Sequence, residues 1–335
     1  MSSNIVEPSA GGESQTVVRQ HSPKVSVCLM IYNGAATLER ALRSLRAQTY
    51  DDYELIISDD HSADDSLVIC RRVTDGDQHV RFIHPERNLG NDPNMRFALS
   101  HAKGKYFVWA CQDDYWEPEF LECLVNVLEQ SPTAVCAQGR VRWFSEDETE
   151  AKDLRLYGRD LPERQSRISL AVSFLTRISR EREYHLKVKN GVFMHGMWNR
   201  AVFSAALNAH GKVFTSERQI LCQAALAGEF RYVDKLLFHK QFYFGKRRER
   251  FAATEATIVA QATSSAWREV QDTLGAIFRS PIISPIVKLI AGPVLMAAFF
   301  RHRSKVKNGL TKMIRKTFRR HVPWQKRGSQ GDGGC

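Results

Sequence analysis

Short apolar runs alternate with amphipathic segments through the first half of the chain, and this alternation constrains the fold more than any other feature. The apolar runs predict strands over residues 24–32, 53–60, 80–84, 105–111 and 133–144. Apolar residues at helical spacing predict intervening helices over 37–48, 66–73, 94–102 and 118–130. Strands that are apolar along their whole length are covered on both faces. The alternation therefore predicts an α/β fold with a mostly parallel, twisted sheet flanked by helices.

Acidic pairs follow two of the predicted strands. Asp59 and Asp60 end the second strand, and Asp113 and Asp114 end the fourth. Ligands of open α/β sheets bind beyond the carboxyl ends of the strands. Carboxylate oxygens suit Mg²⁺ or Mn²⁺, so the predicted partner is a divalent cation that also binds the phosphates of a ligand. Ordinary surface turns are the alternative. The chain has neither a GxGxxG dinucleotide motif nor a P-loop.

Two long stretches around these acids resemble family-2 glycosyltransferases with the GT-A fold. They are "KVSVCLMIYNGAATLERALRSLRAQTYDDYELIISDDHSADDS" and "ERNLGNDPNMRFALSHAKGKYFVWACQDDYWEPEFL". The resemblance is close over 24–140 and looser to about 243. It implies an inverting enzyme that uses a nucleoside-diphosphate sugar with Mg²⁺ or Mn²⁺. The QxxRW motif of processive synthases is absent, which favours transfer of one sugar per encounter.

The resemblance also implies roles for individual residues. It assigns nucleotide-sugar binding to Tyr32, Asn33, Asp59, Asp60, Arg87 and Asp113. Tyr32 would stack on or border the base, Asp60 would bind the base, and Asp114 would coordinate the metal. We therefore expect Asp114→Ala to abolish metal-dependent donor binding and to leave the fold intact. Cys111 stands where fuller forms of the motif have an acid, which thins the metal ligand set, and Met30-Ile31 replaces the usual Pro-Thr.

Inversion requires a carboxylate that takes the acceptor proton. In the family this acid stands at a helix start after an apolar segment. Glu217 in "GKVFTSERQILCQAALAGEF" fits, with a helix predicted over 216–230. The alternative is that Ser216 caps the helix and Glu217 only favours its positive end. The nearby stretch "HKQFYFGKRR" lies where relatives often carry basic residues that close over the diphosphate, although the pattern matches imperfectly.

The net charge of +11 is concentrated near the C-terminus. Residues 301–327 contain eleven Lys or Arg and no acid, and the rest of the chain is balanced. Within 304–321, one predicted helical face is apolar and the others are basic. Before it, residues 281–300 are apolar with one charge, and Pro285 and Pro293 favour a bent or interfacial segment over a spanning helix. This combination is typical of a membrane-surface anchor; the alternative is a solvated helix packed on the main domain.

These features divide the chain into a disordered leader (1–22), a GT-A glycosyltransferase domain (23–245), a helical, basic, membrane-surface extension (246–321) and a disordered tail (322–335). The leader lacks a signal-peptide pattern, and the seven cysteines are odd in number with no CxxC. We expect a cytoplasmic protein, peripheral on the inner face of the plasma membrane. Its acceptor would be lipid-linked or a growing cell-envelope polysaccharide.

Two other functions remain open from the sequence. The first is a catalytically inactive GT-A-like binding protein, which a transfer or donor-hydrolysis assay would distinguish. The second is a nucleic-acid-binding protein that uses the basic C-terminus. Nucleic acid is not the expected partner, because the strand-end carboxylates would repel phosphate and would be left unexplained.

Overall fold

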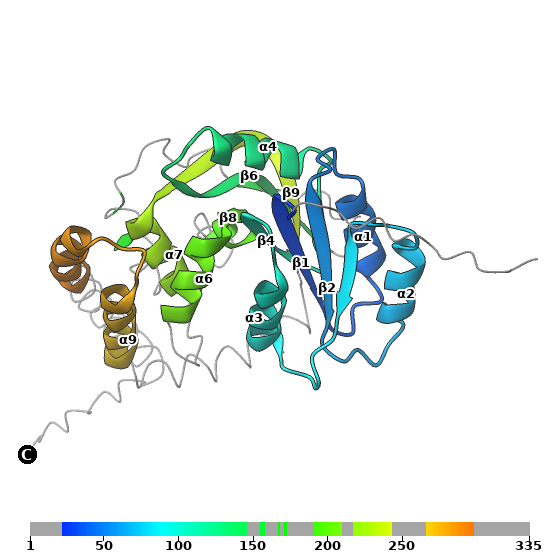
Figure 1. The fold of residues 1–335 in the computed structure, drawn as a ribbon, viewed down its shortest axis with the longest axis horizontal. Coiled ribbons are helices and arrows are strands. Elements are labelled where there is room, and N and C mark those ends of the chain that lie inside the picture. The colour runs from blue at the N-terminus through cyan, green and yellow to red at the C-terminus, as the bar shows by residue number, and fades with distance from the viewer. Residues whose placement is uncertain are drawn as a thin grey trace, which may run out of the picture.

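The computed structural model describes residues 22–145, 155–157, 167, 171–172, 191–209, 217–242 and 266–297 (Figure 1). These residues form a nine-stranded sheet in the order β3-β2-β1-β4-β8-β6-β9-β5, and β7 pairs with β6 beside this path. The leader, the basic segment 304–321 and the tail predicted from the sequence lie outside the described residues, apart from Ser22.

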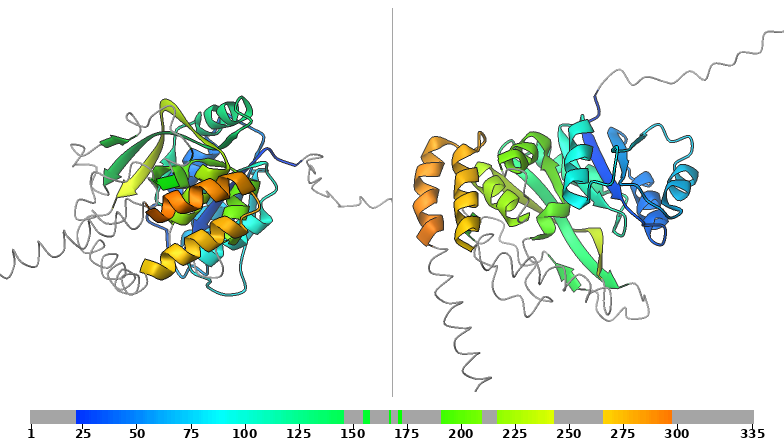
Figure 2. Two further views of the ribbon diagram at one scale, coloured as in Figure 1. Left: turned by 90° about the vertical axis from the view of Figure 1, so that its left-hand side faces the viewer. Right: turned by 90° about the horizontal axis from the view of Figure 1, so that it is seen from below.

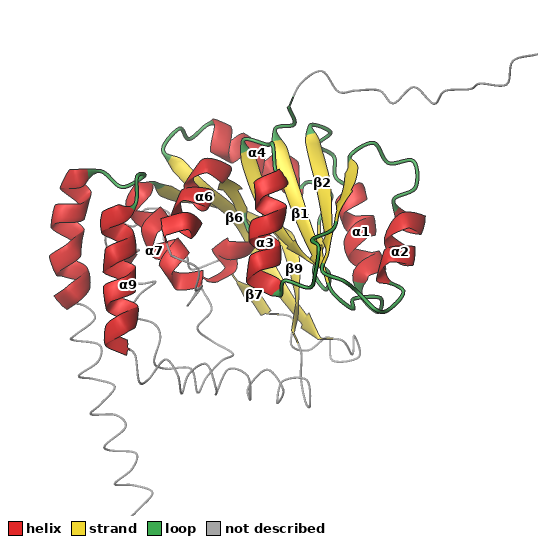
Figure 3. Cartoon of the chain, turned by 60° about the horizontal axis from the view of Figure 1, so that its bottom comes forward, coloured by secondary structure: helices red, strands yellow, loops and turns green. Residues whose placement is uncertain are grey.

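The N-terminal half of the sheet is parallel, as predicted. Its strands are β1 (Val25–Ile31), β2 (Tyr53–Asp59), β3 (Val80–Ile83) and β4 (Tyr106–Cys111). The connecting helices are α1 (Leu38–Arg46), α2 (Ser66–Val73) and α3 (Asn91–His101). From β1 to β3 each new strand is added on the same side of the previous one, whereas β4 lies on the other side of β1. Right-handed crossovers therefore put α1 and α2 on one face and α3 on the other, as Figure 3 shows.

The C-terminal half is mixed, which refines the prediction of a mostly parallel sheet. The long strands β6 (Ala134–Ser145) and β9 (Glu229–Phe242) are parallel to each other. The short strand β8 (Met197–Asn199) is antiparallel to both β4 and β6 and joins the two halves. Short antiparallel strands complete the sheet: β5 (Tyr115–Trp116) on β9 and β7 (Arg155–Tyr157) on β6.

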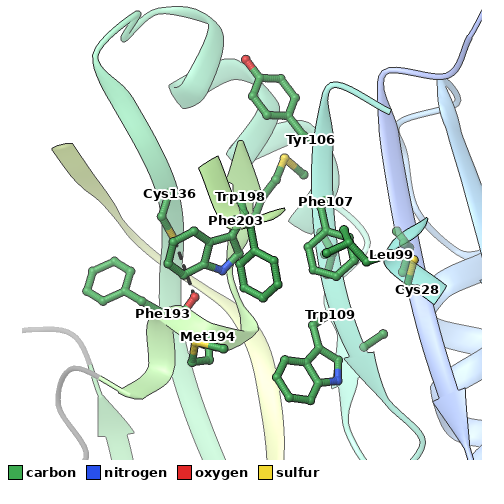
Figure 4. Packing of buried hydrophobic residues seen from close by; sticks show 14 of the residues in the cluster. Cys28, Leu99, Tyr106, Phe107, Trp109, Cys136, Phe193, Met194, Trp198 and Phe203 are labelled. Atoms are coloured by element: carbon green, nitrogen blue, oxygen red, sulfur yellow. Dashed lines mark hydrogen bonds between the residues drawn. The ribbon is translucent and has the colours of Figure 1, made fainter. Parts of the chain in front are cut away.

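A cluster of large aromatic side chains fills the core where the two halves meet (Figure 4). Phe107 of β4 lies 5.0 Å from Phe203, and Trp198 of β8 lies 5.2 Å from the same ring, measured between ring centroids. All three side chains are fully buried. Phe203 belongs to α6 (Arg200–Ala209), so this packing fixes α6 and β8 against the end of β4.

The remaining helices are α4 (Phe120–Glu129), α7 (Glu217–Ala227) and α9 (Ala266–Arg279), with a 3₁₀ helix η3 over Gly191–His195. A further helix spans residues 285–297. It lies beside α9 at the end of the molecule farthest from α1 and α2 (Figure 2). No helix among the described residues is long and apolar enough to cross a membrane.

Candidate active site at the carboxyl edge of the sheet

Gln112 joins the ends of β1 and β4. Its Oε1 accepts the backbone N–H of Tyr32 at 2.8 Å, and its Nε2 donates to the Tyr32 carbonyl at 3.0 Å. The backbone of Tyr32 is thus fixed, while the residue remains 51% exposed. A held, exposed aromatic ring suits the predicted stacking on a planar base. Gln112 itself has no sequence signal, because a lone glutamine after a strand belongs to no recognised motif.

Because Gly34 has no side chain, the amide group of Gln112 fits against it. A Cβ atom at residue 34 would lie 2.3 Å from Gln112 Oε1 and 2.4 Å from Gln112 Cδ. We expect Gly34→Ala to displace the amide and to lower the free energy of unfolding by about 1–3 kcal/mol, through the loss of two hydrogen bonds. Urea unfolding measures the change. In a Gln112→Ala background the same substitution should cost little, and an equal cost in both backgrounds would contradict the contact.

The loop after β1 is tied to the loop after β2. Asn33 has a positive φ of 48°, its backbone N–H donates to Ser62 Oγ at 3.0 Å, and its Oδ1 accepts the N–H of Ala63 at 2.8 Å. Ser66 and Asp64 accept the next two N–H groups, those of Gly34 and Ala35. Asn33 was predicted to bind nucleotide, but its backbone N–H and its Oδ1 hold the loop that presents Tyr32.

Asp59 and Asp60 are both buried at the end of β2. The two oxygens of Asp60 accept the backbone N–H groups of Leu89 at 2.7 Å and Gly90 at 2.8 Å, immediately before α3 begins. Asp60 thus holds the loop that contains the exposed Arg87. Asp59 Oδ1 accepts the N–H of Ser62 at 3.3 Å. A contact between Asp60 and a base would have to use lone pairs that these bonds leave free.

Asp114 is fully buried and has a positive partner within the chain. Its Oδ2 lies 3.2 Å from Nζ of Lys240, and its Oδ1 accepts the N–H of Gln241 at 2.9 Å. Burial raises the pKa of Asp114 to about 7, against the opposing effect of Lys240. Burial also opposes the charge on Lys240, but the nearby Asp114 raises the pKa of Lys240 above its ordinary value. Lys240 therefore keeps its proton, and Asp114 is the member of the pair that titrates near neutrality.

Arg40 fixes the turn that carries the second acidic pair. Its Nη2 donates to the carbonyl of Asp113 at 3.0 Å and to Oε1 of Gln241 at 2.9 Å. The guanidinium also lies over the ring of Phe144, 4.5 Å from its centroid. Asp113 is half-buried beside Asp114. The acidic turn is thus clamped between α1 and β9, two elements that are distant in the sequence.

Three potential metal ligands converge at this turn. One ligand atom each from Cys111, Asp114 and His195 lies within 4.8 Å of the others. Nδ1 of His195 has no hydrogen-bond partner among the described residues, and burial lowers the pKa of His195, so its ring is neutral and able to ligate. Burial, reinforced by the nearby carboxylates, keeps the Cys111 thiol protonated by raising its pKa. The carboxyl group of Asp114 and the neutral imidazole of His195 are groups that can hold a divalent cation, whereas the protonated thiol of Cys111 is not a ligand.

Glu217 is the first residue of α7, and it is exposed. This agrees with the predicted helix; residues 210–216, including the predicted cap Ser216, lie outside the described residues. The carboxylates of Asp114, Asp113 and Glu217 all raise the pKa of Cys111, after the larger effect of burial. The charge of Glu217 therefore acts at the same end of the sheet as the acidic turn.

A mixed, twisted sheet of this topology, flanked by helices, is the fold of the GT-A class of glycosyltransferases. The sequence model of glycosyl transferase family 2 matches residues 26–204, and the chain belongs to that family. The expectation from the sequence is confirmed for the family and for the fold class.

Proteins of known name or structure agree with this placement. The chain is 33% identical over 110 residues to an uncharacterized glycosyltransferase of Rickettsia felis, which covers 33% of this chain and 18% of that protein. It is 24% identical over 234 residues to EpsH of Bacillus subtilis, covering 70% of this chain and 59% of EpsH. The chain thus spans well under two thirds of these relatives. The crystal structure of S. aureus TarS 1-349 is similar in fold, with a TM-score of 0.53, 16% identity, and coverage of 83% and 71%.

Proposed function

We propose that this chain is an inverting, metal-assisted glycosyltransferase that moves one sugar from a nucleoside-diphosphate sugar to a lipid-linked or surface-glycan acceptor. The observation that carries the proposal is the acidic turn after β4, which Gln112 ties to the exposed Tyr32 at the carboxyl edge of the sheet. This edge is where open α/β sheets bind their ligands.

The donor side of the site would bind the nucleotide. Tyr32 would stack on the base from the loop that Asn33 shapes, next to the buried Asp59 and Asp60. Arg87 is exposed on the loop held by Asp60 and is available to the base or the diphosphate. Another crystal structure of S. aureus TarS 1-349, with a TM-score of 0.52 to this chain, is a complex with UDP, which supports a nucleotide as a ligand here.

A divalent cation, Mg²⁺ or Mn²⁺, would be held by Asp114 with His195, next to Asp113. When bound, it supplies positive charge that stabilises the departing diphosphate. Lys240 adds a fixed positive charge at the same place, because its ammonium lies against Asp114. Three side chains that motifs do not predict, Gln112, Arg40 and Lys240, hold these groups in position.

Glu217 would act as the general base on the acceptor side. As the acceptor oxygen attacks the anomeric carbon, the hydroxyl proton passes to the carboxylate and the bond to the diphosphate breaks on the opposite face of the sugar. Attack opposite the leaving group inverts the anomeric configuration. An exposed carboxylate at the start of α7 is accessible to a hydroxyl group from outside.

The proposed acceptor and location are supported by the charge of the chain and by the name of one relative. The chain is 33% identical over 119 residues to a protein of Borreliella burgdorferi named cholesterol galactosyltransferase, covering 35% of this chain and 33% of that protein. A membrane-borne acceptor agrees with that name and with the eleven basic residues in 301–327. We place the protein on the cytoplasmic face of the plasma membrane. A nucleic-acid partner is disfavoured, because the acidic edge repels phosphate in the absence of a cation.

Thermal unfolding with a panel of nucleotide sugars tests this proposal. We expect one class of nucleoside diphosphate, with Mn²⁺, to stabilise the full chain by about 2.7 kcal/mol when present at 100 times its dissociation constant. Donor hydrolysis or transfer should accompany binding. Stabilisation by the donor without turnover on any acceptor or water would favour the inactive binding protein. A panel without any stabilising nucleotide would contradict the proposed function.

A further inference from the structure

The helix over residues 285–297 has an exposed apolar face. Five of the seven large hydrophobic side chains that are exposed among the described residues lie in this helix or next to it in α9. They are Phe278 (55% exposed), Ile286 (70%), Leu289 (75%), Ile290 (51%) and Val294 (42%). Such a concentration of apolar side chains marks an interaction surface, since single exposed hydrophobics are ordinarily scattered.

The exposed face contains no polar side chain. Beyond the exposed Pro285, which begins the helix, the exposed positions occupy about 140° of the helix circumference at about 3.6 residues per turn. They are Ile286, Leu289, Ile290, Pro293, Val294 and Ala297. The opposite side carries the buried Ala291 and Leu295. The single charge of the helix, Lys288, donates to the carbonyl of Phe278 at 2.9 Å, so it is held against α9.

Over its described residues, 285–297, this helix is too short to cross a bilayer. At about 1.5 Å per residue its length is about 20 Å, against a hydrocarbon core of about 30 Å. Pro285 begins the helix, and Ser284 Oγ accepts the N–H of Val287 at 3.4 Å, so the helix start is defined. A short helix with one fully apolar face lies along an interface with that face inserted.

We propose that this apolar face, consisting of residues 286, 289, 290, 293, 294 and 297 with Phe278, docks the protein on an anionic lipid surface. The argument for that partner is charge complementarity. The sequence that follows the helix carries eleven basic side chains and no acid over residues 301–327. Anionic headgroups supply the countercharge and the acyl region receives the apolar side chains. A second copy of the chain would bring the same excess of positive charge to the contact, so the two copies would repel each other. If the chain's own tail covered the face, the positive charge of residues 301–327 would have no countercharge.

Sedimentation of the full chain with vesicles tests the docking surface. We expect binding to phosphatidylcholine vesicles that contain phosphatidylglycerol, weaker binding to phosphatidylcholine alone, and loss of binding at high salt, where charges are screened. The double variant Leu289→Gln with Ile290→Gln should bind at least ~10-fold more weakly, because two apolar side chains no longer leave water. Val68→Gln is the matched control, since Val68 is 64% exposed on α2, and it should bind like the parent.

Two further measurements on the same variants distinguish the other occupants. Because both side chains are exposed, the double variant should keep the parent's unfolding temperature, and its stabilisation by nucleotide should be unchanged. A large fall in unfolding temperature would show that the chain's own tail covers the face. Light scattering that shows a dimer only for the parent would assign the face to a second copy. Either result, or equal vesicle binding by parent and double variant, would overturn the proposal without bearing on donor binding.

Discussion

Glu217→Gln is expected to lower the rate of sugar transfer by a factor of ~10² or more, because an amide cannot take the proton that a positioned base removes. Donor affinity should be unchanged, since the proposed base acts on the acceptor hydroxyl group and not on the donor. Steady-state release of nucleoside diphosphate gives the turnover rate. Calorimetry with the donor and Mn²⁺ gives the affinity.

Glu122→Gln provides the matched control for this prediction. Glu122 is likewise an exposed acid in the first turn of a helix, α4, and it accepts a hydrogen bond from Thr49 that a glutamine can also accept. Either substitution removes a charge that favours a helix start, worth about 0.3–1 kcal/mol. Only Glu217→Gln should affect turnover. If Glu217→Gln turns over at the wild-type rate, Glu217 only stabilises the start of the helix, and another residue is the general base.

The parallel half of the fold follows from local patterns. β1 and β2 are continuous apolar runs bounded by polar turns, so their burial on both faces is visible in the sequence. β8 and β5 were not predicted, because strands of three and two residues are too short to show a period of two. The helix predicted from 118 begins at Phe120, since Pro118 lies before it with its carbonyl bound to the N–H of Thr49.

The residues of the candidate site also divide into those that the sequence could identify and those that only the structure shows. The acidic pairs could be chosen from the sequence because each follows a predicted strand, and Glu217 because it stands at the start of a predicted helix, where the resemblance implies the base. Their roles as ligands and base remain predictions that the experiments above address. The partners of these acids could not be chosen, because Lys240 is 126 residues from Asp114, and Gln241 is 201 residues from Arg40. For Lys240 and Gln241 the sequence offered one indication, the basic stretch "HKQFYFGKRR" that begins at His239.

Asp114→Ala is expected to lower the free energy of unfolding by about 3–5 kcal/mol, because it leaves the ammonium of Lys240 partly buried without its partner. The expectation from the sequence that the substitution leaves the fold intact did not take this ion pair into account. Loss of donor binding in this variant would therefore not identify a metal ligand. Urea unfolding measures the destabilisation. Stability equal to the parent's would show that Lys240 finds another partner or water.

The double variant Asp114→Leu with Lys240→Met separates the structural role of Asp114 from its proposed role as a ligand. Replacing both members of a buried ion pair with apolar side chains of similar size is often neutral or stabilising. We therefore expect a smaller loss of stability than in Asp114→Ala, about 1–3 kcal/mol, because only the N–H of Gln241 loses its acceptor. Cation-dependent binding of a nucleoside diphosphate, measured by calorimetry with and without Mn²⁺, should still be lost because the carboxylate is absent. If the stable double variant keeps a Mn²⁺-dependent affinity like the parent's, Asp114 is not a metal ligand. Its function is then to pair with Lys240, and the cation must be held by other groups at the edge of the sheet.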